Sequence, residues 1–284
     1  MAQVRPATVE MFDDIYPLLA ELNATLPKEK WRRLVDYPWR REGDGIGYVL
    51  VDDGRIVGFL STLHSRRIVD GKEARFCNTA HWIVRKEYRG DSFRLLLAAL
   101  RDPDCTITNL TSSPAVSELM QKLGFQLLEE SLQVFMPVPG IPFRNGAELE
   151  TDADAIAAAL RGGDSAIFAD HERVSGHLLV REGDRYCYIV YSRNHRRMFG
   201  LNVPYCHIQY VSDREIFRRH LARIRWHFLR HCGACFVASD ERFVGRDLGI
   251  FSRAHRLGAP RYYRSRSLAP HQVDNLYTEL VLGL

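Results

Sequence analysis

The chain has 284 residues, of which 46% are hydrophobic and 26% charged, with a formal net charge of +4. This composition is that of a globular protein with a substantial core and excludes a largely disordered chain. No apolar run approaches the roughly 20 residues that span a membrane, and the N-terminus lacks the basic flank and apolar block of a signal peptide. We therefore expect a cytoplasmic protein without membrane insertion.

The charge is divided unevenly along the chain. Residues 1–150 hold 19 Lys and Arg against 21 Asp and Glu, a net of −2, whereas residues 151–284 hold 20 against 14, a net of +6. A basic half of this kind suggests an anionic partner such as a nucleotide, a phosphate or RNA. A solvated, arginine-rich surface is the alternative interpretation.

Six scattered cysteines form no disulfide framework for a cytosolic chain of this size. Cys232 and Cys235 stand at the spacing of metal ligands and follow His231. A structural zinc site usually needs a second such pair, which the sequence does not contain. We therefore predict ordinary thiols and no metal.

The first half alternates strands and helices in a regular order. Asp53-Gly54 and Asp70-Gly71 mark two reversals between β-branched runs, as expected of hairpin turns. Thr8 is expected to cap the first helix. The expected elements are a strand and helix within 3–23, a helix at 31–39, hairpin strands within 47–84, a helix at 91–100, a strand at 105–113, a helix at 114–124 and a strand region at 126–139.

The second half repeats this order loosely. Its expected elements are a hairpin at 174–193, a strand at 205–212, one long helix at 213–233, a strand at 234–240, a helix and turn at 249–265 and a closing strand at 275–282. A connector rich in Pro and Gly lies at 137–148. The sequence therefore predicts two tandem α/β domains, residues 1–140 and 141–284, each a mostly antiparallel mixed sheet flanked by helices.

One short motif, Glu87 to Phe93, has the pattern of an anion site. A strand runs into Arg89-Gly90-Asp91-Ser92, and an apolar helix follows at once. The free N–H groups and the positive end of the helix dipole at such a helix start favour a phosphate, and Arg89 adds a forked cationic donor. Alone this signal is weak, because many helices begin near a glycine and an arginine.

The context of the motif strengthens it. From "VRPAT" through "YVLVDDGRIVGFLS", "TAHWIV" and "YRGDSF" to "SPAVSELMQKLGF", the first half resembles the GNAT (GCN5-related N-acetyltransferase) family over nearly its whole length. The resemblance implies a strand end that hydrogen-bonds the pantetheine arm of acyl-coenzyme A (acyl-CoA), acetyl-CoA or another, as an added strand would. It also implies a loop that binds the pyrophosphate, and a degenerate second copy of the same domain. The cofactor-binding residues that it implies are Trp82, Ile83, Val84, Arg89, Gly90, Asp91, Ser92, Phe93, Arg94 and Ser113.

The sequence departs from the family pattern in ways that bear on chemistry. Ser92 and Arg94 stand where the family loop normally has small residues. Ser113 replaces the usual Asn at the start of the late helix, and Met120 replaces its usual Tyr. Because a thioether donates no proton, the common general acid of the family is absent.

Acyl transfer to an amine requires a base, and His81 on the predicted fourth strand is our first candidate. Its ordinary pKa near 6.5 suits the task, although a strand histidine is equally often a satisfied half-buried side chain. Asn78 would orient the substrate or a water, or else be a polar residue facing the ladder. Asn109 and Thr111 are candidate substrate contacts on the neighbouring strand. Cys77 is a weaker candidate as an acyl-accepting nucleophile, because nothing marks it as activated.

Two basic segments of the second half raise the question of RNA binding. The helix predicted at 213–233 carries six arginines, and "RYYRSRS" at 261–267 mixes arginine with aromatic residues. For each, a structural reading is the alternative: a basic outer helix face opposite a buried stripe, and a late β-segment with its tyrosines packed inward.

Three functions are compatible with these patterns. The first is an acyl-CoA-dependent N-acyltransferase of the GNAT type that acts on a small amine bound between the halves. An anionic acceptor, such as an amino sugar carried on a nucleotide or lipid diphosphate, would suit the charge of the second half. The second is an aminoacyl-tRNA-dependent transferase similar to the Fem enzymes, which would bind tRNA. The third is a binding protein that keeps the fold without catalysis. We rank the acyltransferase first.

Overall fold

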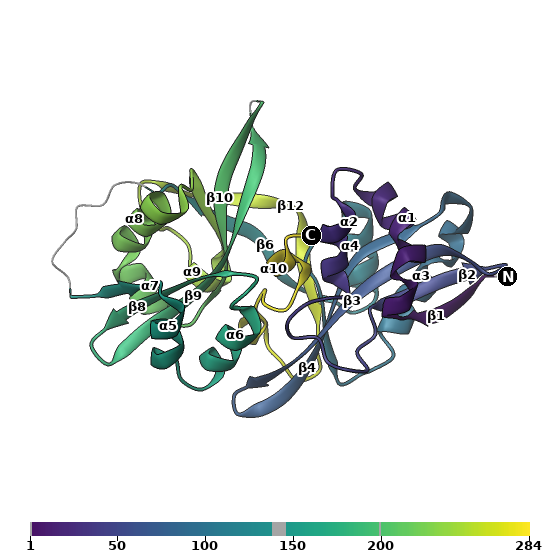
Figure 1. The fold of residues 1–284 in the computed structure, drawn as a ribbon, viewed down its shortest axis with the longest axis horizontal. Helices are drawn as coiled ribbons and strands as arrows, with labels where there is room; N and C mark the ends of the chain where they lie inside the picture. The colour runs from purple at the N-terminus through teal and green to yellow at the C-terminus, as the bar shows by residue number, and fades with distance from the viewer. Residues whose placement is uncertain (1, 138–145, 199) are drawn as a thin grey trace.

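A computed structural model describes residues 2–137, 146–198 and 200–284. Its central element is one mixed sheet of twelve strands, in the order β1-β2-β3-β4-β5-β12-β6-β11-β10-β9-β8-β7. Figure 1 shows two lobes side by side, with β6 and β12 running between them. The expected class, a mostly antiparallel mixed sheet flanked by helices, is confirmed. The domain boundary predicted between residues 140 and 141 lies outside the described residues.

The elements of the first half follow the expected order. The turns at Asp53 and Asp70 have φ of 45° and 49°, and a glycine follows each, as a tight hairpin requires. The elements are β1 (Gln3–Ala7), η1 (Val9–Met11), α1 (Phe12–Leu22), α2 (Lys28–Trp31), η2 (Arg32–Leu34), β2 (Gly47–Asp52), β3 (Arg55–Val69), β4 (Lys72–Val84), η3 (Lys86–Asp91), α3 (Ser92–Ala99), β5 (Cys105–Asn109), α4 (Pro114–Lys122) and β6 (Gln126–Phe135). Thr8 makes no side-chain cap, contrary to expectation, because a 3₁₀ turn precedes α1.

The second half differs from its prediction at three places. The long helix breaks at His220, whose φ of −106° and ψ of 17° are not helical. The prediction of a helix and turn at 249–265 is wrong, because this segment forms strand β12. The prediction of a closing strand at 275–282 is also wrong, because the chain there forms the short helix α10. The elements are β7 (Glu148–Glu150), α5 (Ala153–Ala159), α6 (Gly163–His171), β8 (Gly176–Glu182), β9 (Arg185–Met198), β10 (Leu201–Val211), α7 (Arg214–Arg219), α8 (Leu221–Cys232), β11 (Phe236–Asp240), α9 (Glu241–Val244), β12 (Ser252–Arg264), η4 (Pro270–Gln272) and α10 (Glu279–Leu282).

Strand β12 joins the two halves. It lies between β5 and β6, with Tyr262 opposite both Asn109 and Leu127. Strand β6 in turn pairs with β11 of the second half, with Phe135 opposite Val237. The sheet of the first half is therefore continued by a strand that is encoded about 130 residues later, and the two halves share one hydrogen-bonded ladder.

The helices cover both faces of the sheet. Along β3, Phe59 faces a core with α1 and α2, and the adjacent Leu60 faces a core with α3 and α4, as the alternation of a strand requires. The closing segment (residues 274–282) packs into the α1–α2 core through Leu276 and Leu282. In the second half, Phe217 of α7 and Phe228 of α8 fill a third core. No helix among the described residues is long and apolar enough to cross a membrane.

Candidate functional site

Strands β4 and β5 run parallel and then separate, which opens a fork in the sheet. Their pairing runs from Arg75 opposite Cys105 to Asn78 opposite Thr108 and ends there. Beyond this point the residues Trp82 to Val84 pair only with β3, on their other side. Within the described residues, the edge of β4 that faces the fork therefore has no strand partner, although its peptide groups have full hydrogen-bonding capacity. The predicted pantetheine-binding residues lie along this edge.

His81 occupies a β-bulge at the mouth of the fork. The β3–β4 register shifts between Leu60 and Ser61, and His81 has a φ of 42°, a left-handed conformation that is uncommon for a histidine. The edge of the Trp31 ring packs against its imidazole, with centroids 5.0 Å apart. The bulge thus places His81 on the face of the sheet that α2 covers.

The hydrogen bonds of His81 assign its tautomer. The Ser61 hydroxyl donates to the carbonyl of Ala80 at 2.8 Å, so its oxygen is left to accept from Nδ1 of His81 at 3.2 Å. Nε2 then carries the lone pair. Burial lowers the pKa of His81 from 6.5 to about 4. His81 was predicted as the base because of its ordinary pKa, and that reason does not hold in the structure. At neutral pH the His81 ring is uncharged, so it accepts a hydrogen bond but does not take up a proton.

We expect the His81 ring to titrate near pH 4 in a proton NMR titration of its Cε1–H resonance, because burial under Trp31 penalises the imidazolium. A His81→Gln variant identifies the resonance by its disappearance. A midpoint near 6.5 would show that the ring is solvated, and would restore it as a base at neutral pH.

A buried polar floor closes the fork at its base. Asn78 donates to the hydroxyl of Thr108 at 3.2 Å, and Thr79 donates to the carbonyl of Thr108 at 3.0 Å. Asn109 donates to the carbonyl of Thr79 at 3.1 Å, while its own carbonyl oxygen has no partner within the described chain. The predicted site residues Asn78 and Asn109 thus each hydrogen-bond to the facing strand, Asn78 to Thr108 and Asn109 to Thr79. Because the Asn78 amide is committed to these contacts, it holds the strands in place.

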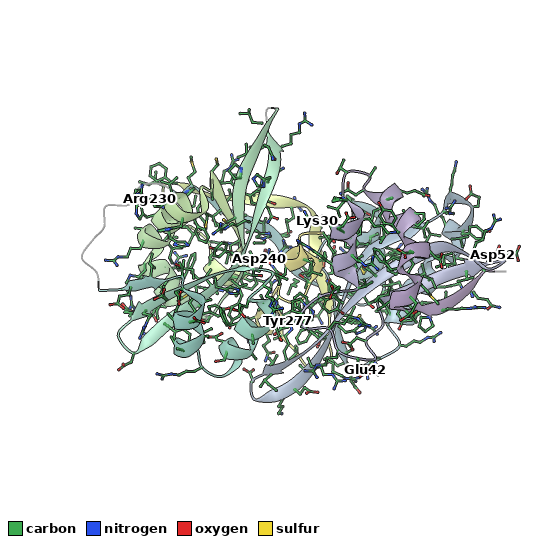
Figure 2. All side chains as sticks on the ribbon, in the orientation of Figure 1. Lys30, Glu42, Asp52, Arg230, Asp240 and Tyr277 are labelled. Carbon is green, nitrogen blue, oxygen red and sulfur yellow. The ribbon has the colours of Figure 1, made fainter. Side chains whose placement is uncertain are left out.

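The closing segment brings a carboxylate to this floor that sequence reasoning missed. Glu279 is fully buried, and the Thr111 hydroxyl donates to its Oε1 at 2.7 Å. The Glu279 N–H meets the Asn78 side-chain carbonyl at 3.5 Å. The only sign in the sequence is one acidic residue in the apolar run "NLYTELVL". Figure 2 labels Tyr277 of the same segment near the centre of the molecule.

The predicted phosphate loop is a 3₁₀ turn that leads directly into α3. The Ser92 hydroxyl donates to the carbonyl of Arg89 at 2.7 Å. Arg94 donates to the carbonyl of Ala2 at 2.8 Å and to the Asp91 carboxylate at 3.0 Å. Arg94 thus neutralises the one acid at the helix start. The exposed guanidinium of Arg89 bonds to no described residue, which leaves it as the free cation at this helix N-terminus.

The structure also gives the surroundings of the other first-half candidates. Ser113 caps α4 by accepting from the Val116 N–H at 3.4 Å, with Pro114 at the first helical position. Phe93, the second residue of α3, is half-buried. Met120 is fully buried in the core that α3 and α4 cover. Cys77 is buried, and this burial raises the pKa of its thiol well above 9.0. Cys77 is therefore no nucleophile at neutral pH.

The corresponding position in the second half holds a buried ion network. Strands β10 and β11 are also parallel, and β10 also has a register shift, at Gln209. At the end of β11, Asp240 is fully buried and accepts from Arg261 at 2.5 Å and from Arg242 at 3.0 Å. Figure 2 labels Asp240 near the boundary of the two lobes. These charges satisfy one another, so this end of β11 is filled by protein.

Several arginines of α7 and α8 also bind their own chain. Arg218 donates to the carbonyls of Val244 and Arg246, and Arg225 donates to that of Leu248. Arg219 pairs with Glu182 at 2.6 Å. A basic face available to RNA would need these guanidinium groups free. Likewise Tyr262 and Tyr263 of "RYYRSRS" are buried, which is the structural reading of that segment.

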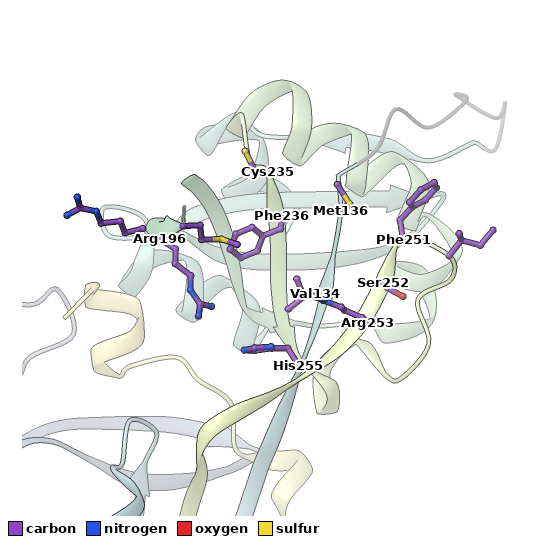
Figure 3. Close-up of a pocket in the computed structure, with 12 residues that line it drawn as sticks. Val134, Met136, Arg196, Cys235, Phe236, Phe251, Ser252, Arg253 and His255 are labelled. Carbon is purple, nitrogen blue, oxygen red and sulfur yellow. The ribbon is translucent and has the colours of Figure 1, made fainter. Parts of the chain in front are cut away.

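Two sizeable cavities lie away from the fork. One of about 1,010 Å³ is lined by the β3–β4 turn, α6 and the end of β10, and thus lies at the opposite end of β4 from His81. The other, of about 610 Å³, lies over β11 and is shown in Figure 3, with Phe236 and Phe251 beside Arg253 and His255. Among the described residues, no group of three or more His, Cys, Asp or Glu side chains could hold a metal ion.

No protein-family model matches the sequence, and neither does any curated protein. Among solved structures, the fold is similar to a GCN5-related N-acetyltransferase from Anabaena variabilis, at 14% identity and a TM-score of 0.62, over 93% of this chain and 72% of that one. A second, from Kribbella flavida, matches at 16% identity and a TM-score of 0.60, over 93% and 71%. Saccharomyces cerevisiae N-myristoyltransferase with bound myristoyl-CoA matches at 10% identity and a TM-score of 0.53, over 98% and 84%. At such identities the similarity shows the GNAT fold.

Proposed function

We propose that the protein is an acyl-CoA-dependent N-acyltransferase whose reaction takes place at the fork of the first half. The observation that carries this proposal is the unpartnered edge of β4 from Trp82 to Val84, beside a loop with one free arginine, Arg89. An extended pantetheine arm is able to pair with such an edge as a strand does. The fold shared with acyltransferases supports the proposal.

Two parts of the chain would hold the two ends of an acyl-CoA. Arg89 and the first turn of α3 would hold the pyrophosphate, because Arg94 neutralises Asp91 and leaves the loop cationic. The thioester would then lie near the bulge at His81. CoA supplies an activated acyl group; the residues of the chain bind it, orient the amine and handle the proton.

The reaction is attack by the neutral amine on the thioester carbonyl. A nitrogen–carbon bond forms, the carbon–sulfur bond breaks, and the thiolate leaves. Nε2 of His81 would accept a hydrogen bond from the amine and aim its lone pair at the carbonyl. Because the thiolate is able to take the second proton of the attacking amine, the reaction does not require a tyrosine at the position of Met120.

For the acceptor we propose a small amine. The excess charge of the second half suggested an anionic amino sugar, but arginines such as Arg218, Arg219 and Arg242 are engaged within the chain. These internal pairs also weigh against tRNA as the partner. Acetyl-CoA and myristoyl-CoA are the two donors to compare first, since the acyl length is not fixed by the residues at the fork.

Arg89→Ala should weaken the binding of acetyl-CoA about fivefold to tenfold, because it removes the free cation beside the proposed pyrophosphate. Isothermal titration calorimetry with acetyl-CoA and then myristoyl-CoA gives the dissociation constants. Arg101→Ala, an exposed arginine after α3, is the matched control and should leave binding unchanged. If the wild type binds neither donor at millimolar concentration, the acyltransferase proposal fails and a non-catalytic binding protein takes its place.

A further inference from the structure

We propose that Glu279 is the catalytic base of this reaction and that it takes the proton of the acceptor amine through the hydroxyl of Thr111. This inference rests on the proposed function and names the group that completes it. The starting point is that His81, at neutral pH, has no capacity to keep the proton that an ammonium must lose. Another group at the fork must therefore accept the proton of the ammonium.

One oxygen of the Glu279 carboxylate has no hydrogen-bond donor among the described residues. Its Oε1 accepts from Thr111 at 2.7 Å, but its Oε2 is buried without a partner within the described chain. A buried carboxylate normally has both oxygens satisfied, because an unpaired one forfeits its hydration. Asn109 presents a second unpartnered buried oxygen on the same floor. The unpaired Oε2 leaves the Glu279 carboxylate short of hydrogen bonds, so it has capacity to take up a proton.

Thr111 connects this carboxylate to the outside. Thr111 is exposed and lies just after the end of β5. A hydroxyl both donates and accepts, so Thr111 is able to accept from an amine N–H while it donates to Glu279. The amine substrate need not enter the core, because only the Thr111 hydroxyl lies between the surface of the fork and the buried carboxylate of Glu279.

The surroundings of Glu279 make it a stronger base than an exposed glutamate. Burial is the largest influence and raises its pKa above 4.5, against the opposing effects of the Thr111 and Asn78 contacts and of Arg261 on β12. The groups that face it are Asn78 from β4, Thr111 after β5 and Arg261 from β12. Arg261 is itself paired with Asp240, which limits its pull on Glu279.

The proton transfer balances in one concerted step. An N–H bond of the acceptor ammonium breaks, and its proton moves to the oxygen of Thr111. The O–H bond of Thr111 breaks, and that proton moves to Oε1 of Glu279. The products are a neutral amine and a protonated Glu279. The amine then attacks the thioester, the CoA thiolate takes the second amine proton, and Glu279 releases its proton to solvent through Thr111.

The test compares steady-state kinetics and acetyl-CoA binding in four variants with an acceptor that the wild type turns over. Glu279→Gln should lower kcat at least 100-fold while the dissociation constant of acetyl-CoA changes less than twofold. It should also abolish the rise of kcat/KM with pH that reports ionisation of the base. Thr111→Val should lower kcat at least tenfold, and Thr111→Ser should restore it to within threefold.

Glu129→Gln is the matched control. Glu129 is also a buried acid whose pKa is raised, but it lies on β6, which β12 separates from β5, and it accepts from the Arg242 N–H at 3.1 Å. Its pH profile should be that of the wild type. Equal kcat and an unchanged pH profile in Glu279→Gln would overturn the inference while leaving the acyltransferase intact. If the wild type binds no acyl-CoA, both proposals fall together.

Discussion

Residues 1–136 expressed alone are expected not to fold, and the same fragment should fold when residues 147–284 are supplied beside it. Strand β12 separates β5 from β6, so the isolated fragment loses the strand that pairs with both. It also loses Tyr262 from the α3–α4 core and the closing segment from the α1–α2 core. Circular dichroism and the dispersion of amide resonances measure the loss.

The reconstitution arm distinguishes this cause from a poorly chosen cut. A mixture of the two fragments should elute as one complex and regain the dispersed spectrum, because every strand partner is again present. A fragment 1–136 with native dispersion on its own would show that β12 is dispensable to the first half. The two halves would then be independent domains in the sense that the sequence suggested.

Asp240→Asn should lower the free energy of unfolding by about 3–5 kcal/mol, one of the largest effects of any single substitution here. Asp240 is fully buried and offsets the charges of the buried Arg261 and the half-buried Arg242. Removal of one member of a buried ion network leaves uncompensated charge in the interior. Urea denaturation followed by tryptophan fluorescence measures the change. Asp184→Asn, at the exposed β8–β9 turn, should change the same quantity by less than about 0.5 kcal/mol.

The pH dependence of stability provides a second readout of Asp240. Burial alone would raise the pKa of its carboxyl, but Arg261 and Arg242 outweigh burial and hold the pKa well below 3.8. Its contribution is therefore fully present above pH 3.8 and is lost as the pH falls below that value toward its folded pKa. The difference in stability between wild type and Asp240→Asn should shrink as the pH falls from 5 to 2. A difference that stays constant over this range would contradict the ion-network explanation.

The sequence predicted what local chemistry determines. The sequence was enough to predict several elements that depend on neighbours within a few residues: the Asp-Gly turns, α3, α4 with its start at Pro114, and the Asp213 cap of α7. Strand β12 could not be predicted in this way. Its Gly258 and Pro260 look like a turn, and they are tolerated because they fall where the β6–β12 register shifts, between Arg256 and Arg261.

The candidate site shows the same division. The positions of His81 and of the Arg89 loop followed from the order of strands and from the helix start. The low pKa of His81 did not, because it arises from burial under Trp31 of α2, fifty residues earlier in the chain. Glu279 also stayed hidden, since its role depends on a segment about 170 residues away from Thr111 folding back onto the fork.

The exchange of strands also bears on how the protein is made. When β6 leaves the ribosome, β12 does not yet exist, and the roughly 130 residues between the ends of the two strands take roughly 6–26 s to synthesise at about 5–20 residues per second. During that interval the edges of β5 and β6 that β12 later covers are unpaired, and such edges are able to pair with strands of other chains. The fork gains Glu279 after all twelve strands of the sheet, so under the proposed function a nascent chain becomes competent for acyl transfer only after residue 279 has left the ribosome.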